Sequence, residues 1–173
     1  MQRVLIIGSG GSGKSTLARQ ISEITHLPVL HLDAYYWRTG WKPTPDSEWE
    51  ERVQELAAGD RWIMDGNYSR TLHLRLPRVD TIVLLELPRA LCLWRVVSRS
   101  IKYRSQTRPD MAEGCPERVS LEFLKWVWNY THRSLPVTLQ KIEEHGQHAA
   151  VHRLRSTRQI HNFIAGLHSA HSD

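Results

Sequence analysis

The stretch that decides the fold is Val4-Leu5-Ile6-Ile7-Gly8-Ser9-Gly10-Gly11-Ser12-Gly13-Lys14-Ser15-Thr16, near the start of a chain of 173 residues. Its second part satisfies the phosphate-binding pattern G-x-x-x-x-G-K-[ST]. Glycines allow successive peptide N–H groups to turn inward toward phosphate oxygens. An apolar run precedes this loop and apolar residues at helical spacing follow it, so the order strand, loop, helix argues against a merely flexible Gly/Ser turn.

The phosphate-binding loop, residues 8–16, also predicts which atoms contact the ligand. Lys14 supplies a mobile positive charge for the β- and γ-phosphates, and Ser15 occupies the position whose hydroxyl binds Mg²⁺. The helix that follows points its positive N-terminal end at the same phosphates. We therefore expect a ligand with phosphate groups and Mg²⁺; in the kinase hypothesis stated below this ligand is ATP, with contacts from Gly8, Gly10, Gly11, Ser12, Gly13, Lys14, Ser15 and Thr16.

Composition and charge fit one globular domain over residues 1–173. Hydrophobic residues make up 40% and charged residues 24% of the chain, which are ordinary globular values. No apolar run reaches the length of a membrane span and no signal-peptide pattern is seen, so we expect a cytoplasmic protein without membrane partners. Cys92 and Cys115 have no partners at zinc-like spacing, so we expect reduced thiols and no zinc-bound lid. The net charge of +5 suits either phosphorylated substrates or a nucleic acid.

Short apolar runs alternate with helical patterns along the whole chain. Strands are expected at 4–7, 29–32, 62–64, 81–87 and 149–154. This alternation predicts an α/β protein whose parallel sheet is covered by helices on both faces, with right-handed crossovers. Ligands of such sheets bind at the carboxyl edge of the strands.

Prolines, glycines and hydroxyl residues set the expected helix ends. Thr44 caps a second helix that Gly59 ends, and Pro88 begins a third. The next helix is expected to be interrupted at Ser134-Leu135-Pro136, Ser156 to cap the last one, and the tail after Leu167 to be loose. From Tyr103 to Pro116 the helical period fails, which predicts a mobile lid over about residues 103–117.

Two aspartates are expected at strand ends. Asp65 would hold magnesium through water, and the alternative is a turn-forming Asp-Gly. Asp33 would accept a hydroxyl proton from the acceptor or, if the acceptor is a phosphate, help organise the metal; the alternative is a helix cap or turn. His31 is expected to point elsewhere as a packed structural residue. The acceptor-binding segment, about 33–60, carries aromatic residues that would stack on a planar acceptor or cover the core: Tyr35, Tyr36, Trp37 and Trp41.

A long basic segment follows the fourth strand, with no acidic residue from Arg89 to Pro109. Arg95 and Arg99 lie one helical turn apart, and further arginines continue into the predicted lid. A lid that closes over the site would bring these arginines onto the phosphates of the ligand. We therefore expect Arg99, Arg104 and Arg108 to neutralise the negative charge that develops in the transition state. The alternatives are a solvated basic face or a nucleic-acid patch.

On these residues the chain resembles the small P-loop kinases of the adenylate kinase-like group. The likeness is closer to bacterial proteins labelled DNA topology modulation proteins or adenylate kinase-related kinases, and it rests on Ile7 to Thr16, Leu32-Asp33-Ala34-Tyr35-Tyr36-Trp37, Trp62 to Tyr68, and Thr107 to Pro116. The resemblance implies a three-layer P-loop NTPase fold with a five-stranded parallel sheet of order 2-3-1-4-5. It also implies that Arg95 lies against adenine and that Arg99 contacts phosphate.

One departure concerns the acceptor. Adenylate kinases carry Asp-Gly-Phe-Pro-Arg after the third strand, whereas this chain has Asp65-Gly66-Asn67-Tyr68-Ser69-Arg70. The sequence therefore does not single out AMP. Our hypothesis is an ATP- and Mg²⁺-dependent phosphotransferase acting on a small acceptor, a nucleotide or nucleoside. The alternative is a nucleotide-binding regulator that contacts DNA through its basic helix and lid, although no DNA-reading module is recognisable.

Overall fold

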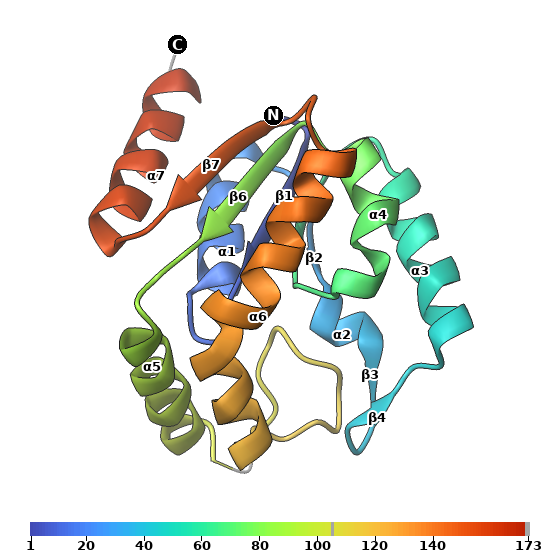
Figure 1. Ribbon diagram of the computed structural model, residues 1–173, viewed down its shortest axis with the longest axis vertical. Helices are drawn as coiled ribbons and strands as arrows, with labels where there is room; N and C mark the ends of the chain where they lie inside the picture. The colour runs from blue at the N-terminus through green and yellow to red at the C-terminus, as the bar shows by residue number, and fades with distance from the viewer. Residues whose placement is uncertain (105, 172–173) are drawn as a thin grey trace.

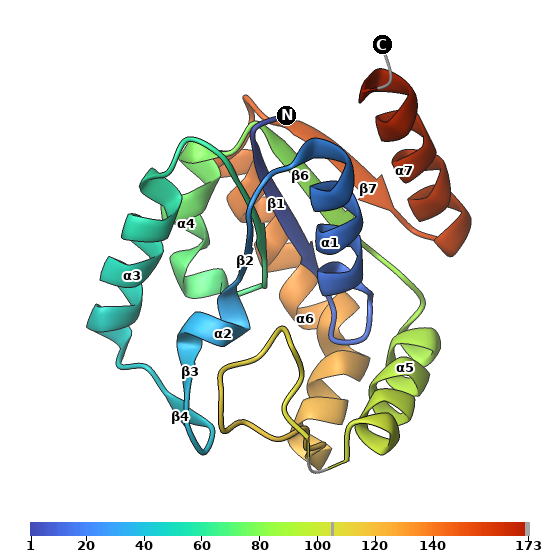
Figure 2. The same cartoon turned by 180° about the vertical axis from the view of Figure 1, so that it is seen from behind.

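The computed structural model describes residues 1–104 and 106–171, and its centre is a parallel five-stranded sheet between two layers of helices (Figures 1 and 2). The strands are ordered β2-β5-β1-β6-β7. Counting only the strands of this sheet along the chain gives the predicted order 2-3-1-4-5, because β3 (Trp37–Arg38) and β4 (Lys42–Pro43) form a separate antiparallel hairpin. The predicted α/β fold class is confirmed. The five strands are β1 (Arg3–Gly8), β2 (Val29–His31), β5 (Trp62–Asp65), β6 (Thr81–Leu85) and β7 (Ala150–Leu154).

The alternation of side chains along β1 explains the two helical layers. Val4 and Ile6 point to one face, which α1 (Lys14–Thr25) and α7 (Thr157–His171) cover. Leu5 and Ile7 point to the other face, where the covering helices are α3 (Asp46–Ala58), α4 (Leu72–Arg75) and α6 (Leu121–His145). Since both faces of the sheet are buried, the strand reads as a continuous apolar run.

Most helix ends follow the expected signals. Gly59 ends α3, Pro88 precedes α5 (Arg89–Lys102), and the Ser156 hydroxyl accepts a hydrogen bond from Gln159 N at 3.2 Å before α7. The start of α3 is shifted, because Pro45 rather than Thr44 is its N-cap. The remaining short elements are α2 (Leu32–Tyr36), η1 (Ser69–Thr71) and η2 (Leu76–Arg78).

Three sequence-based expectations about boundaries are wrong. Asp33 is not at a strand end, because β2 stops at His31 and the fully buried Leu32 turns the chain into α2. α6 runs unbroken through Pro136, since burial of its face toward the sheet outweighs the one helical hydrogen bond that a proline removes. α7 continues through His171, so the tail is helical up to there, and Ser172 and Asp173 lie outside the described residues.

The segment between α5 and α6 crosses the carboxyl edge of the sheet beside the β3–β4 hairpin (Figures 1 and 2). It contains no helix, as predicted for the lid, although Ser105 lies outside the described residues. Hydrogen bonds join it to the hairpin: Gly40 N donates to Gly114 O at 3.0 Å, and Trp41 Nε1 donates to Pro116 O at 3.0 Å. The lid and the hairpin are therefore one connected surface. Among the helices described, none is long and apolar enough to cross a membrane.

Candidate functional site

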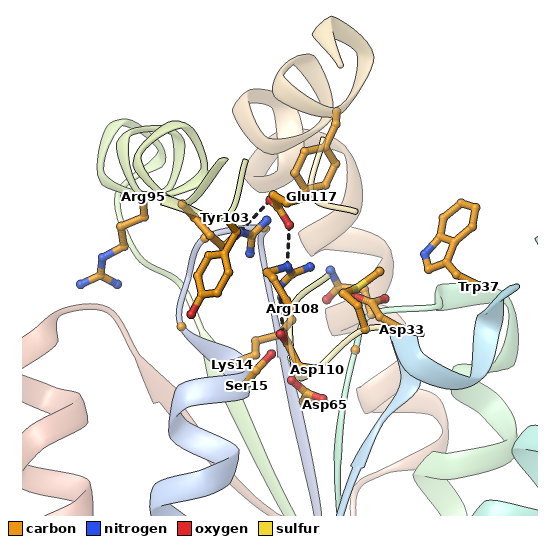
Figure 3. Close-up of a pocket in the computed structure, with 18 of the residues that line it drawn as sticks. Lys14, Ser15, Asp33, Trp37, Asp65, Arg95, Tyr103, Arg108, Asp110 and Glu117 are labelled. Atoms are coloured by element: carbon orange, nitrogen blue, oxygen red, sulfur yellow. Dashed lines mark hydrogen bonds and ion pairs between the residues drawn. The ribbon is translucent and has the colours of Figure 1, made fainter. Parts of the chain in front are cut away.

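A cavity of about 930 Å³ opens at the carboxyl edge of the sheet, between the phosphate-binding loop, α2, the end of β5 and the lid. Figure 3 shows Arg95 and Trp37 toward opposite ends of it, with Lys14, Ser15 and Arg108 between them. A ligand that spans this cavity therefore passes over the phosphate-binding loop in its middle.

The shape of the phosphate-binding loop depends on two glycines. Gly11 has φ 76° and Gly13 has φ 95°, both in the left-handed region that side chains disfavour. At Gly11 an added Cβ would also lie 2.2 Å from the carbonyl oxygen of Cys92 on α5. The loop therefore packs directly against the backbone of α5, the helix that carries the arginines.

The Lys14 ammonium lies within this loop. Its Nζ donates hydrogen bonds to Gly8 O at 3.0 Å and to Ser9 O at 2.9 Å. Burial lowers the pKa of Lys14, and the nearby carboxylates of Asp65 and Asp33 oppose that shift. An ammonium held between carbonyl oxygens and carboxylates is placed to move onto an incoming phosphate.

Asn67 fixes the start of the same loop. Its Oδ1 accepts from Gly8 N at 3.1 Å, and its Nδ2 donates to Gly8 O at 2.8 Å. The carbonyl oxygen of Gly8 thus has two donors, Asn67 and Lys14. When Lys14 turns to a phosphate, the bond from Asn67 still satisfies that oxygen.

Asp65 ends β5 with its carboxylate 5% exposed. Its Oδ1 lies 2.7 Å from Nδ1 of His31, its register partner on β2, so the expectation that His31 points elsewhere is wrong. Although burial lowers the pKa of His31, the hydrogen bond with Asp65 and its charge raise it by more. The ring therefore fixes the orientation of the carboxylate.

The oxygens at this point fit Mg²⁺. Ser15 and Asp65 both line the cavity, and a hydroxyl with a water-bridged carboxylate is a donor set suited to that ion. Within the described residues, no group of three or more His, Cys, Asp or Glu side chains is arranged to hold a metal. Phosphate oxygens and waters would have to complete the octahedral shell, as is usual for magnesium bound with a nucleotide.

Asp33 reaches the cavity from α2. Its Oδ1 accepts a hydrogen bond from the Tyr68 hydroxyl at 2.5 Å. Burial raises the pKa of Asp33, and the Tyr68 hydroxyl and the Lys14 charge act against that rise. The site therefore holds a half-buried carboxylate that has one oxygen already bonded.

Two of the predicted arginines converge on Glu117, whose side chain is 2% exposed. Arg99 Nε lies 3.0 Å from Oε1. Arg108 Nε lies 2.5 Å from Oε2, and Figure 3 shows Arg108 and Glu117 side by side. Arg108 Nη1 also donates to Asp110 Oδ2 at 2.8 Å. Although burial raises the pKa of Asp110, the Arg108 charge and the Ser15 hydroxyl lower it by more. The lid thus brings its own carboxylate to the predicted magnesium position.

The structure brings most of the predicted site residues together. The cavity is lined by Gly10, Gly11, Gly13, Lys14, Ser15, Thr16, Asp33, Asp65, Arg95, Arg99 and Arg108. Gly8 and Ser12 instead support the loop from behind: Gly8 bonds Asn67, and the buried Ser12 hydroxyl donates to Ser9 O at 2.8 Å. The structure corrects the expectation that Arg104 contacts the phosphates, because its side chain is exposed and does not line the cavity.

Five residues of the site were not singled out for a role from the sequence: His31, Asn67, Tyr68, Asp110 and Glu117. Asp110 could have been found as the first acidic residue after the long basic segment, whereas Glu117 follows Glu113 and no sequence signal separates the two glutamates. Asn67 and Tyr68 stand where the resemblance to adenylate kinases fails. The contact of His31 with Asp65 could be found only from the register of β2 against β5, which places the two residues side by side.

Comparisons with known proteins give the fold. No protein-family model matches the chain, and the search of curated proteins gives no match. Among solved structures, shikimate kinase from Acinetobacter baumannii in complex with shikimate has a TM-score of 0.59 at 15% identity, over 96% of this chain and 90% of that chain. Shikimate kinase from Bacteroides thetaiotaomicron has a TM-score of 0.59 at 16% identity, over 98% and 97%. The chain therefore shares the fold of these two proteins, a parallel five-stranded sheet between helices with a phosphate-binding loop after its first strand. The closer resemblance to DNA topology modulation proteins stays a prediction.

Proposed function

We propose that residues 1–173 form a kinase domain that uses ATP and Mg²⁺ to phosphorylate a small acceptor, a nucleotide or a nucleoside, in the cytoplasm. The observation that carries this proposal is that one cavity is lined by Lys14, Ser15 and Asp33. A phosphate site and a half-buried carboxylate that line one space are what transfer to an acceptor requires, because such catalysis is mostly positioning and charge neutralisation.

The donor side of the cavity supplies the cations. Lys14 would bind the β- and γ-phosphates, while Arg95 at the far end would lie against the adenine ring. Arg99 and Arg108 have their Nε atoms on Glu117, so Arg99 keeps its Nη donors, and Arg108, whose Nη1 bonds Asp110, keeps Nη2 for phosphate charge that develops during transfer. Ser15 and Asp65 would hold Mg²⁺, which when bound neutralises phosphate charge and orients the γ-phosphate.

The acceptor side combines aromatic rings with a carboxylate. Trp37 and Trp41 line the cavity with ring centroids 5.4 Å apart, and Arg118 lies 4.9 Å above the Trp41 ring. Indole faces suit a planar base, which supports a nucleoside or nucleotide. The acceptor-binding segment would thus run from about 33 to 60, with the lid over about 103–117 closing on it.

The alternative, a nucleotide-binding regulator that contacts DNA, derives from the resemblance to DNA topology modulation proteins. This alternative is less favoured, because the Arg99 and Arg108 side chains that would contact DNA point inward and pair with Glu117. Among the described residues of the basic segment, the exposed cations left for an outside surface are Arg89, Lys102 and Arg104. Salt-dependent duplex binding that persists after replacement of both inward arginines would favour this alternative.

The test is an ATP-dependent phosphorylation screen over nucleosides, nucleoside monophosphates and small hydroxyl metabolites. Shikimate belongs in the panel because one of the similar structures holds it. We expect Lys14→Ala to abolish transfer to the acceptor that wild type uses, whereas replacement of the exposed Lys102 leaves transfer unchanged. Full turnover by Lys14→Ala, or no transfer by wild type to any acceptor, would contradict the proposal.

A further inference from the structure

The loop Gly66-Asn67-Tyr68 lies between the two halves of the site and is held by a buried guanidinium. Arg75 is fully buried. Its Nη1 donates to Gly66 O at 3.1 Å, and its Nη2 donates to Asn67 O at 2.6 Å and to Tyr68 O at 3.0 Å. Three successive carbonyl groups are thus fixed by one side chain, so the side chains of the loop are aimed by a rigid backbone.

Tyr68 is the strained member of this loop. Its φ of 37° and ψ of 61° place it in the left-handed region, which a bulky residue rarely adopts. Thr71 N also donates to Tyr68 O at 3.0 Å, and the ring packs against Tyr36 and Trp49 with centroids 4.7 and 4.9 Å away. Strain that the surroundings enforce in this way is typical of functional positions.

This arrangement aims the Tyr68 hydroxyl at Asp33, with 2.5 Å between the phenol oxygen and Oδ1. In the part of the chain that the structure describes, no hydrogen bond reaches Oδ2 of Asp33, whose residue lines the cavity. A carboxylate accepts several hydrogen bonds, so one oxygen is engaged by the protein and the other remains for a ligand.

We propose that Tyr68 is a positioning residue that orients the Asp33 carboxylate toward a hydroxyl group of the acceptor. The inference rests on the proposed kinase function and deepens it, because it makes the acceptor an alcohol rather than a phosphate monoester. The hydroxyl proton passes to Asp33, the acceptor oxygen bonds to the γ-phosphorus, and the bond from that phosphorus to the β,γ-bridging oxygen breaks, which leaves ADP. A phosphate group at this carboxylate would be repelled.

The charged groups around Asp33 determine how removal of the Tyr68 hydroxyl would change the pH dependence of the activity. Burial raises the pKa of Asp33, as does Asp65 of β5, while the Tyr68 hydroxyl, Lys14 of α1 and Arg108 of the lid lower it. The base must be ionised to accept a proton. Removal of the phenol hydroxyl takes away a hydrogen bond to the ionised form, so the pKa rises and activity is lost at a higher pH on the acidic side.

The test is Tyr68→Phe, which keeps the ring packed on Tyr36 and Trp49 and removes only the hydroxyl. We expect kcat/KM for the acceptor to fall about 10- to 100-fold, the KM for ATP to stay constant, and the acidic limb of the pH profile to move upward. Tyr36→Phe is the matched control, since Tyr36 belongs to the same aromatic cluster. A Tyr68→Phe enzyme with wild-type kcat/KM and pH profile overturns the inference, as does a screen in which only phosphate monoesters are phosphorylated.

A second measurement separates this inference from the proposed function. The ¹³C-carboxyl resonance of Asp33, assigned with Asp33→Asn, is titrated in wild type and in Tyr68→Phe without any acceptor. We expect a higher pKa in Tyr68→Phe, and an unchanged titration overturns the inference even if wild type is an active kinase. If wild type transfers phosphate to nothing, the proposed function fails and the acceptor role of Tyr68 fails with it, while the titration still decides whether the phenol holds the carboxylate.

Discussion

Glu117→Gln tests the charge cluster that joins the lid to α5. The carboxylate lies between Arg99 and Arg108, and its side chain is 2% exposed. Glutamine fills nearly the same volume and keeps one oxygen that accepts hydrogen bonds. It removes the negative charge, so two guanidinium groups then face each other without a carboxylate between them.

The size of the effect follows from burial. Removal of one partner from a buried ion pair costs about 3–5 kcal/mol, and the retained oxygen and the partial exposure of Arg99 place this case near the lower end. A free-energy loss of about 3 kcal/mol lowers the Tm of a chain of this length by roughly 6–12 °C. Bound ATP would supply negative charge to the same arginines, so the stabilisation by ATP and Mg²⁺ should be larger in Glu117→Gln than in wild type.

The assay is thermal unfolding followed by circular dichroism, with and without ATP and Mg²⁺. Glu113→Gln is the matched control, because Glu113 is an exposed glutamate of the same loop. We expect Glu113→Gln to unfold within about 1 °C of wild type. If Glu117→Gln also matched wild type, the carboxylate would not be compensating the two arginines and the reasoning would be refuted.

Three further predictions concern other parts of the molecule. Asn67→Asp loses the donor to Gly8 O and places a negative charge beside the phosphate-binding loop, so the Kd for ATP should rise about tenfold in calorimetry; an unchanged Kd would contradict the role of the amide. Burial raises the pKa of Asp80, but hydrogen bonds from Thr81 and from the backbone N–H groups of Arg3 and Gln2 lower it below the ordinary 3.8. Its contribution to stability is therefore present above that value and is lost as the pH falls through the lower folded-state value, so urea unfolding should show Asp80→Asn about 1 kcal/mol less stable at neutral pH, with the difference vanishing in strong acid. Chelation of Mg²⁺ should abolish phosphate transfer and leave the Tm measured without ATP unchanged, because the protein oxygens alone do not complete the metal shell.

The sheet and the donor side could be predicted because their signals are local. The pattern from Gly8 to Ser15 fixes a strand, a loop and a helix together, and apolar runs mark the other strands. The strand order came from the resemblance and agrees with the observed pairing. Where local signals competed with burial, burial decided the outcome, as at Pro136 within α6.

The contacts that orient the site side chains could not be predicted because they join distant parts of the chain. The pairs His31 with Asp65 and Tyr68 with Asp33 depend on strand register and on the bend of α2 after β2. The role of Glu117 depends on its ion pair with Arg99 of α5, 18 residues earlier in the chain, which no spacing rule encodes. Arg104 shows the same limit, since its place in a basic run says nothing about which way its side chain points.

The hydrogen bonds between the β3–β4 hairpin and the lid have a consequence for enzyme engineering. Trp41 lines the cavity at the proposed acceptor site and also donates to Pro116 O, so a substitution chosen to admit another acceptor removes a lid contact as well. Changes in the hairpin and in the lid should therefore show epistasis, with double variants departing from the sum of the single ones. Libraries that vary Trp41 together with residues 114–116 will reach acceptor specificities that libraries of the hairpin alone do not.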